Sequence, residues 1–524
     1  MMLNVLKFTM KKLGNIIEHD LMIGDLMVKI TFLIGTGYYG EDVLHKTPWA
    51  RYLNKSHDLY VVSRIKPEIH LNKFLDKIIG HEGTVNIRNS LVELMNLVKD
   101  FFIVYDSQYL QKEYTKNEIN ELEQWLNIPF NYLSSFDRRF YDKNNSCDSR
   151  NKMELNNYLA GLLLLFREFF KKNNVKVFIN TLEDDVFSVM AYFVAKRLGL
   201  KIIGFTPGRF PKKGMMFCED FSELCDFRMS DSDLKKIKSM YNVSTIANKE
   251  TLDRTSDYLG IKSFLTRYKS LECVKDNKDY RKNVISYYNY EKFIIPPISV
   301  FKEFNLYFKK FCRRYLLRSI LKKPDYDNSY FLFPLHYTED AQITFREPIL
   351  DQFRLINDIS RSLPLNCYLY VKPHPHYLGS DVSFKKLFRI SKLENVKIIN
   401  PTYPPIKLIT NSQGVITVNS TTGFEALIMG VPVITLGHDF YCKDDLCYTI
   451  KDKKNLAEAI MKILCNDYSI DRKTVESFIK KVYSNTVWID GINYNYGKFR
   501  PFGLTEVDGK HIASALDLIM NCGA

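Results

Sequence analysis

The chain has 524 residues, of which 46% are hydrophobic and 26% charged; this is enough for two to four domains with large buried cores and excludes a disordered protein. The net charge of +14 favours an anionic partner, such as nucleic acid, an acidic membrane surface, or a phosphorylated or acidic sugar. No apolar run reaches the roughly 20 residues of a membrane span, and ten cysteines without a CxxC pair or a secretory signal predict reduced thiols in the cytoplasm.

The N-terminal region has the pattern of alternating strands and helices. Its first strand is expected in VKITFLIG, just after Met27, so residues 1–26 are interpreted as an N-terminal extension, with Met1 and Met27 both open as the translation start. The later elements of this region are short β-rich runs at 57–63 and 101–107, a helix at 153–171, and a strand–helix–strand unit at 175–180, 185–198 and 200–207.

The C-terminal region shows the same alternation without interruption. Strands are expected at 329–336, 367–373, 396–400, 414–420 and 431–437, and helices at 348–362, 383–393, 405–411, 421–429 and 454–465. Strands separated by helices of this length predict parallel sheets with helices on both faces.

The predicted fold is therefore α/β, with two doubly wound, Rossmann-like domains. The expected divisions of the chain are an N-terminal α/β domain at 27–225, a mainly helical basic linking segment at 226–325, a C-terminal α/β domain at 326–475, and C-terminal helices at 476–524.

Ligands of such sheets bind beyond the carboxyl ends of the strands, and polar residues gather at these ends in the C-terminal domain. One strand ends at His336, and the next ends in Lys372-Pro373-His374. Because prolines on both sides of His374 hold the backbone extended, we expect its imidazole to face a phosphate beside Lys372. His376 is expected to be solvated, and a purely structural histidine is the plainer alternative at 374.

The stretch NSTTGFEAL, at 419–427, follows another of these strands. Thr422 and Glu425 fit a capping box, which is a purely structural interpretation. The free N–H groups at a helix start also bind phosphate, and Glu425 would then accept hydrogen bonds from a ribose. The candidate phosphate ligands are Ser420, Thr421, Thr422 and Gly423, the glycine allowing a close approach to the backbone.

Three motifs follow one another between residues 329 and 441: FPLHYTEDAQITFREPILDQFRLINDISRSLP, VKPHP, and VITVNSTTGFEALIMGVPVITLG. Together they resemble the C-terminal half of bacterial capsule and surface-polysaccharide biosynthesis proteins, which include the capsular Kdo transferases. This family has a GT-B glycosyltransferase fold and shares its His-Pro motif with bacterial sialyl- and polysialyltransferases. The resemblance implies that the residues named above bind the donor nucleotide, and that His336 and Glu339 face a cleft between the domains.

In the N-terminal domain, GTGYYG at 35–40 follows a strand and formally fits the G-x-G-x-x-G of a dinucleotide site. Such a site also needs an acid at the end of the next strand, which here ends in Ser63-Arg64. We therefore interpret Gly35 and Gly37 as part of a strand–helix turn on the acceptor side of the cleft.

A glycosyltransferase needs a carboxylate, either as the base that deprotonates the acceptor hydroxyl or as a nucleophile. Acids at the start of a helix also complement the helix dipole, which is the structural alternative. The first catalytic candidates are Glu183, Asp184 and Asp185, the next are Glu41 and Asp42, and Arg209 is the candidate for holding an acidic sugar or a phosphate.

No metal or other cofactor is expected, because the DxD spacings at 231–233 and 325–327 fall outside strand ends. A helix dipole, a histidine and a lysine can stabilise a leaving phosphate instead. Residues 301–323 combine apolar positions at helical spacing with a basic face, typical of a packed helix or of peripheral attachment to an anionic membrane. No nucleic-acid-binding module is found.

The sequence thus predicts a cytoplasmic glycosyltransferase of capsule or surface-polysaccharide biosynthesis, with peripheral contact to the inner face of the cytoplasmic membrane as an option. It would move a sugar from a nucleotide donor, CMP-linked donors being one choice, to a glycan or lipid-linked glycan acceptor. Two alternatives stay open: a CDP-polyol phosphotransferase or nucleotide-sugar epimerase on the same fold, and a non-catalytic polysaccharide export or assembly protein.

Overall fold

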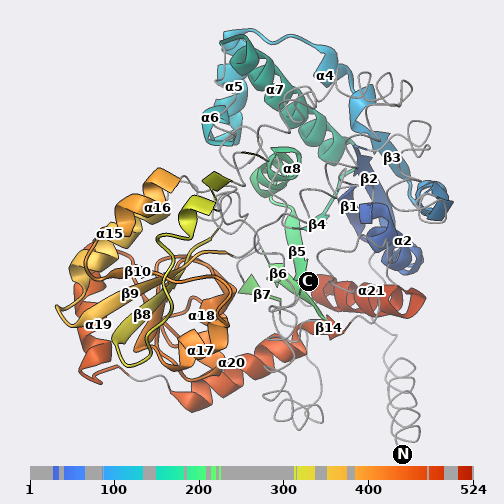
Figure 1. Cartoon of the computed structure of the whole chain (residues 1–524). Coiled ribbons are helices and arrows are strands. Elements are labelled where there is room, and N and C mark those ends of the chain that lie inside the picture. Colours follow the sequence, from blue (N-terminus) through green and yellow to red (C-terminus); the bar gives the residue numbers. More distant parts are fainter. Residues whose placement is uncertain are drawn as a thin grey trace, which may run out of the picture.

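The computed structural model describes residues 27–34, 41–64, 85–86, 88–133, 149–181, 186–207, 214–219, 223–225, 308, 312–313, 315–336, 351–374, 384–468, 471–488 and 505–521. Within these residues the chain forms two β-sheets, each with helices packed against it (Figure 1). The predicted α/β class with two doubly wound sheets is confirmed.

The first sheet has the strand order β14-β6-β5-β4-β1-β2-β3, with β7 paired to β6. Its strands are β1 Lys29–Ile34, β2 Asp58–Ser63, β3 Asp100–Ile103, β4 Val177–Thr181, β5 Lys201–Pro207, β6 Gly214–Glu219, β7 Glu223–Leu224 and β14 Thr486–Trp488. Strands β1 to β5 are parallel, as predicted, whereas β6, β7 and β14 pair in antiparallel fashion. The strand order reverses between β1 and β4, which makes this pair the switch point of the sheet.

Helices cover both faces of the first sheet because successive side chains of each strand point to opposite sides. One face packs on helices α5 Lys116–Leu126, α6 Phe130–Leu133, α7 Ser149–Lys172 and α8 Val186–Arg197. The other face packs on α2 Glu41–Leu53 and α21 Glu506–Asn521. A 3-10 turn at Val104–Asp106 and the short helix α4 Gln108–Gln111 follow β3.

The second sheet has the order β10-β9-β8-β11-β12-β13, and every pair in it is parallel. Its strands are β8 Ser329–Pro334, β9 Cys367–Lys372, β10 Val396–Ile398, β11 Gly414–Thr417, β12 Val433–Thr435 and β13 Tyr448–Thr449. Here the order reverses between β8 and β11. These two strands are therefore the switch point of the C-terminal domain.

The central strands of this sheet are buried on both faces, which explains their nearly continuous apolar sequence. In β8, Phe331 and Phe333 point to one core cluster, whereas Tyr330 and Leu332 point to the other. The first cluster is completed by α15 Gln352–Ser362, α16 Phe384–Ile390 and α19 Leu456–Leu464, and the second by α17 Pro405–Thr410, α18 Thr421–Ile428 and α20 Arg472–Ser484.

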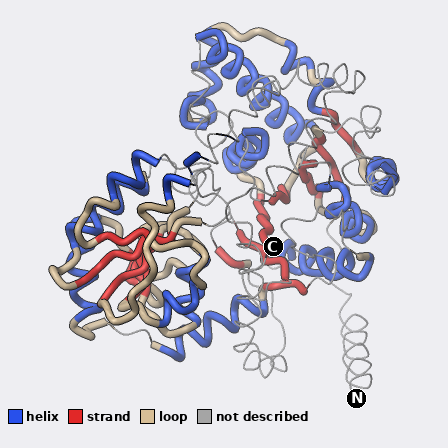
Figure 2. The backbone as a smooth tube through the Cα atoms, viewed as in Figure 1, coloured by secondary structure: helices blue, strands red, loops and turns tan. Residues whose placement is uncertain are grey.

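The end of the chain returns from the second sheet to the first, as the red elements of Figure 1 show. Helix α20 packs with α18, and β14 then pairs with β6. Helix α21 lies on α2, where a Cβ at Gly509 would come within 2.6 Å of the backbone of Pro48. The range 476–524 was predicted to be helical throughout, and the structure places the short strand β14 within it (Figure 2).

The predicted linking segment at 226–325 lies mostly outside the described residues. Its last part forms helical turns up to Ser319–Ile320, and then a bridge between Lys322 and Ile399 attaches it to the edge of the second sheet. No helix within the described ranges is both long enough and apolar enough to span a bilayer.

Candidate functional site

The carboxyl ends of β8, β9 and β11 lie together because these strands are parallel neighbours. At a switch point the connections on the two sides leave in opposite directions, which opens a crevice where ligands of doubly wound sheets bind. His336 comes two residues after β8, and Ser420 comes three residues after β11. The topology therefore brings these predicted residues to the switch point, with the end of β9 next to them.

Lys372 ends β9 and is almost completely buried, with 8% of its surface exposed. Its Nζ donates a hydrogen bond to the carbonyl oxygen of Pro401 at 3.1 Å. Burial lowers the pKa of the ammonium group to about 8, and the charge of Glu425 opposes part of this shift. An anion such as phosphate would favour the charged form of this lysine, so the site is suited to an anionic ligand.

His374 stands two residues beyond β9 and, unlike Lys372, is exposed at the edge of the sheet. The proline between them is buried, so the chain leaves the core within one residue. His376 and the following residues to 383 lie outside the described ranges. The structure thus places one buried cation and one exposed imidazole at the end of the same strand.

Helix α18 begins with a cap that differs from the predicted one. Ser420 is the N-cap residue, and its Oγ accepts a hydrogen bond from the backbone N–H of Thr422 at 3.2 Å. The predicted capping box of Thr422 and Glu425 is wrong, because Thr422 already lies in the first turn and the third helical position is Gly423, which has no side chain. The first turn, which starts at Thr421, still directs N–H groups and the positive end of the helix dipole to the sheet edge.

Gly423 is required by packing within the protein. A Cβ at this position would lie 2.7 Å from Tyr441 Oη and 2.8 Å from Thr417 Cγ2. The Tyr441 hydroxyl donates to the carbonyl oxygen of Ser420 at 2.6 Å, and Thr417 Oγ1 accepts from the N–H of Ser420 at 3.2 Å. Tyr441 therefore holds the start of α18 from the segment after β12, while the predicted role of Gly423 beside a phosphate stays a prediction.

His336 is buried, with 8% of its surface exposed, and its backbone is held by one side chain from α15. The amide of Gln352 accepts from the N–H of His336 at 2.9 Å and donates to its carbonyl oxygen at 3.2 Å. The sequence reasoning missed both Gln352 and Tyr441. The only signal for Gln352 is a polar residue at the start of an amphipathic helix, and Tyr441 gives none until the fold places it beside α18.

The candidates of the N-terminal domain follow β1 and β4, the neighbours at the switch point of the first sheet. Helix α2 begins at Glu41, so Glu41 and Asp42 occupy its first turn, but their side chains lie outside the described residues. The predicted site residues that lie wholly outside the described ranges are Gly35, Gly37, Glu183, Asp184, Asp185, Arg209 and Glu339.

Only one of the two DxD spacings, 325–327, lies within the described residues. In this spacing, Asp325 accepts a hydrogen bond from the N–H of Asp327 at 3.2 Å. The two residues thus form a turn before the amino end of β8, whereas the candidate site lies at the carboxyl ends of the strands. Residues 231–233 lie outside the described ranges. Among the described side chains, no group of three or more His, Cys, Asp and Glu is arranged to hold a metal ion.

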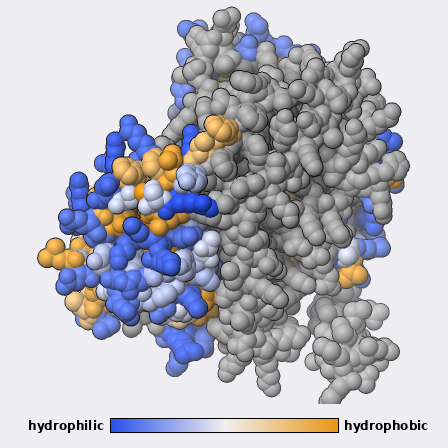
Figure 3. Space-filling view, in the orientation of Figure 1, coloured by the Kyte–Doolittle hydropathy of each residue, from blue (hydrophilic) through white to orange (hydrophobic). Residues whose placement is uncertain are grey.

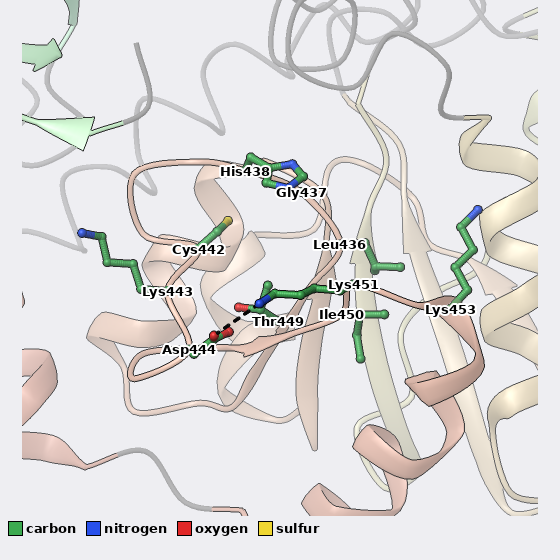
Figure 4. A pocket seen from close by; sticks show the side chains of 10 residues that line it. All are labelled: Leu436, Gly437, His438, Cys442, Lys443, Asp444, Thr449, Ile450, Lys451 and Lys453. Carbon is green, nitrogen blue, oxygen red and sulfur yellow. Dashed lines mark ion pairs between the residues drawn. The ribbon is translucent and has the colours of Figure 1, made fainter. Parts of the chain in front are cut away.

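A cavity of about 490 Å³ lies at the carboxyl ends of β12 and β13, further along the same edge of the sheet (Figure 4). Its walls are formed by the segments 436–438, 442–444 and 449–453, and include three lysines and His438. The segment that contains Tyr441 thus borders the start of α18 on one side and this cavity on the other.

A comparison with known proteins finds that the part of the chain that forms this edge of the sheet matches a protein family. Residues 271–463 match the family model described as "Capsule polysaccharide biosynthesis protein". The match covers less than half of the chain, but it runs from before β8 into α19 and includes every described candidate residue of the C-terminal domain. The family resemblance predicted from the sequence is confirmed over this range.

Two relatives align with part of the chain. Protein FixF of Sinorhizobium fredii is 31% identical over 126 residues, which are 23% of this chain and 28% of FixF. The capsule polysaccharide export protein KpsS of Escherichia coli is 28% identical over 152 residues, which are 27% of this chain and 39% of KpsS. The chain therefore spans well under two thirds of the length of either relative.

Among solved structures, the chain is similar to Thermosulfurimonas dismutans KpsC, a beta Kdo 2,7 transferase, with 14% identity and a TM-score of 0.30. The similarity covers 68% of this chain and 89% of that one. A likeness this distant supports no inference about the site.

Proposed function

Since residues 271–463 match the family model described as "Capsule polysaccharide biosynthesis protein", we propose that the chain is a glycosyltransferase of capsule or surface-polysaccharide assembly with a nucleotide-sugar donor. One observation carries the proposal: within the matched range, a buried lysine and an exposed histidine follow β9 and a helix N-terminus follows β11, on the two sides of β8 at the same edge of the sheet. Together these are groups that bind the phosphates of a nucleotide.

In the proposed reaction, the acceptor hydroxyl attacks the anomeric carbon of the donor sugar. The bond between this carbon and the phosphate oxygen breaks, and the phosphate leaves with the electron pair. The first turn of α18, Lys372 and His374 would stabilise the negative charge on the leaving phosphate. Glu425, partly buried in α18, is the proposed ribose ligand. His336 would be a further residue that contacts the donor nucleotide.

The acceptor proton must pass to a base. Carboxylates of the N-terminal domain remain our proposal for this step, because they follow strand ends at the switch point of the first sheet. Glu183→Gln, Asp184→Asn and Asp185→Asn should identify the base. One of these variants should lose turnover at least about a hundredfold while it keeps its affinity for the nucleotide. The proposed reaction uses no metal ion or other cofactor, so EDTA should leave turnover unchanged.

The donor site is tested by calorimetric titration of the full chain with CMP, CDP, UDP and GDP. We expect one nucleotide to bind, and His374→Ala to weaken this binding at least about tenfold through the loss of a charge-assisted contact. His511→Ala is the matched control, because His511 is an exposed histidine on α21. Normal nucleotide binding by the His374 variant would show that the assigned site is wrong.

Product analysis then separates this function from its alternatives. A glycoside product supports a transferase, a phosphodiester product a CDP-polyol phosphotransferase, and an isomerised free nucleotide sugar an epimerase. The name of KpsS, an export protein, keeps a non-catalytic role open as a second candidate for this chain. Glycan binding without any nucleotide binding would favour that role and exclude the proposed transferase.

We further propose a peripheral contact with an anionic membrane on the cytoplasmic side, through residues of the predicted segment 301–323. Phe308, Tyr315 and Leu316 are 54%, 63% and 49% exposed, and Arg318 follows them. Figure 3 shows apolar surface interspersed with hydrophilic surface on the C-terminal domain. Such a contact would bring a lipid-linked acceptor to the enzyme.

A further inference from the structure

The cavity beyond β12 and β13 is lined by side chains of three kinds. Leu436 and Ile450 give it an apolar wall, while Asp444 supplies carboxylate oxygen atoms. Four potential cations also border it, which are His438, Lys443, Lys451 and Lys453. A volume of about 490 Å³ falls within the range of small-molecule sites.

Lys451 is the cation that lies across the cavity. Figure 4 shows its side chain directed to Asp444, with Lys443 and Lys453 on opposite sides and His438 above it in the view. The Nζ of Lys451 and Oδ2 of Asp444 are 3.9 Å apart, and the two side chains are 84% and 73% exposed. A pair this long and this exposed is weak, so an entering anion can replace Asp444 as the partner of Lys451.

The chemistry of the lining matches a sugar with one anionic substituent. The apolar wall suits the face of a pyranose ring, and Asp444 can accept hydrogen bonds from its hydroxyl groups. The lysines suit a carboxylate or a phosphate. The cavity lies at β12 and β13, which are the first and second strands beyond β11 in the sheet. A nucleotide bound at the switch point between β8 and β11 therefore does not need to occupy the cavity.

We propose that this cavity is a second substrate subsite, which binds an acidic or phosphorylated sugar residue of the glycan. The identification of the bound sugar as substrate rests on the proposed function, whereas the binding itself does not. Lys451 binds the anionic group, and Asp444 competes with that group for Lys451.

The test is a titration by ligand-observed NMR with D-glucuronate, D-glucose 6-phosphate and neutral D-glucose as probes. We expect the two anionic sugars to bind more tightly than glucose. The ratio of the dissociation constants of glucuronate and glucose 6-phosphate will show whether the site prefers a carboxylate or a phosphate. Lys451→Gln should weaken the anionic sugars about three- to tenfold, and Asp444→Asn should strengthen them. Lys473→Gln, at an exposed position of α20, makes the same charge change away from the cavity and should alter nothing.

Opposite effects of the Lys451 and Asp444 variants support the subsite, because a general loss of folding would weaken binding in both. Equal binding of all three sugars, or no effect of Lys451→Gln, would overturn it. Nucleotide titrations of the same variants keep the two proposals apart. If nucleotides bind normally but Lys451→Gln changes the affinity of no sugar, the subsite proposal fails and the transferase proposal stands. If Lys451→Gln changes sugar affinity but no nucleotide binds, the transferase proposal fails and the subsite proposal stands.

Discussion

At the scale of single residues, the start of α18 depends on a tyrosine that lies outside its helix. The hydroxyl of Tyr441 is 2.6 Å from the carbonyl oxygen of Ser420 and occupies the space beside Gly423. Tyr441 itself is fully buried, so this contact is held by the core rather than by a mobile surface side chain. The geometry of this turn, our candidate for phosphate binding, is thus set by packing within the core.

This arrangement predicts coupling between two substitutions. Tyr441→Phe removes the hydroxyl and should cost about 1 kcal/mol, while Gly423→Ala forces a methyl group against Oη and should cost about 1–3 kcal/mol. In the double variant the methyl group no longer meets Oη. The double variant should therefore lose less unfolding free energy than the sum of the two single losses, by at least about 0.5 kcal/mol. Urea unfolding of the four proteins measures this coupling.

The control pair combines Gly423→Ala with Tyr468→Phe. Tyr468 packs against the core cluster on the opposite face of the sheet, so its substitution should be additive with that of Gly423. Additive behaviour of the Tyr441 pair would contradict the close contact that we assign to it.

Lys372 predicts an unusual dependence of stability on pH. Burial lowers its pKa from 10.5 to about 8 in the folded chain, with Glu425 opposing part of the shift. Between these two values the unfolded state binds more protons than the folded state, so this group makes the free energy of unfolding rise with pH. The cost of burying the charged ammonium is present below about pH 8 and relieved as the pH approaches 10.5.

Compared with Lys372→Met, the unmodified chain should therefore gain about 3 kcal/mol of stability between pH 7.5 and 10.5. The difference between the two proteins isolates this lysine from tyrosines and cysteines that titrate in the same range. Lys407→Met, at an exposed position of α17, should keep the pH profile of the unmodified chain. A constant difference in stability between the unmodified chain and the Lys372→Met variant across this range would refute the assigned pKa.

At the scale of elements, most parallel strands were predictable because they are apolar runs that alternate with helices. Strand β13 was not predicted, because its two residues are too few to give a periodic pattern. The strands β8, β9 and β11 lie within their predicted ranges. Strand β14 was not predicted, because its three residues follow directly on an amphipathic helix and give no periodicity of their own. The N-cap of α18 was misplaced by two residues because Ser420, Thr421 and Thr422 are all suitable caps, and only tertiary packing selects Ser420.

Helix α21 predicts a stability effect at a distance from the candidate donor site. Leu516 is fully buried in the cluster that also contains Phe32 and Trp49 of the N-terminal domain. Leu516→Ala should destabilise that domain by about 2–5 kcal/mol, because it leaves a cavity in the core. Nucleotide affinity, measured by calorimetry below the unfolding transition, should stay unchanged.

The matched control is Leu518→Ala, two positions further along the same helix and 51% exposed. It should change stability by no more than about 0.5 kcal/mol. Equal effects of the two substitutions would mean that α21 does not pack on the first sheet as described.

At the scale of the whole molecule, the donor side of the candidate site was more predictable than the acceptor side. Strand ends of a parallel sheet share one edge, so His336, Lys372 and Ser420 could be grouped from the order of strands and helices alone. Gln352 and Tyr441 could not, because they reach the site through side-chain packing between elements distant in sequence. The cavity at β12 and β13 could not be predicted either, since it depends on how the chain turns between these two short strands.

The net charge of +14 and the exposed apolar side chains predict binding to anionic vesicles. The full chain should sediment with vesicles that contain phosphatidylglycerol, less at high salt, and less after Tyr315→Ser with Leu316→Ser. Leu365→Ser, at a fully exposed leucine in another part of the domain, is the control and should leave binding unchanged. If the double variant sediments as well as the unmodified chain, these residues do not contact the membrane.

The return of the chain through α20 to β14 and α21 also has a consequence for synthesis on the ribosome. The N-terminal domain is translated first, yet the strand and the helix that complete its sheet and core leave the exit tunnel only after the whole second sheet. The C-terminal domain, whose sheet is continuous in sequence between β8 and β13, can close before that moment. The N-terminal domain, although it is made first, is therefore expected to finish folding after the C-terminal domain, and to need protection from premature association until α21 has been made.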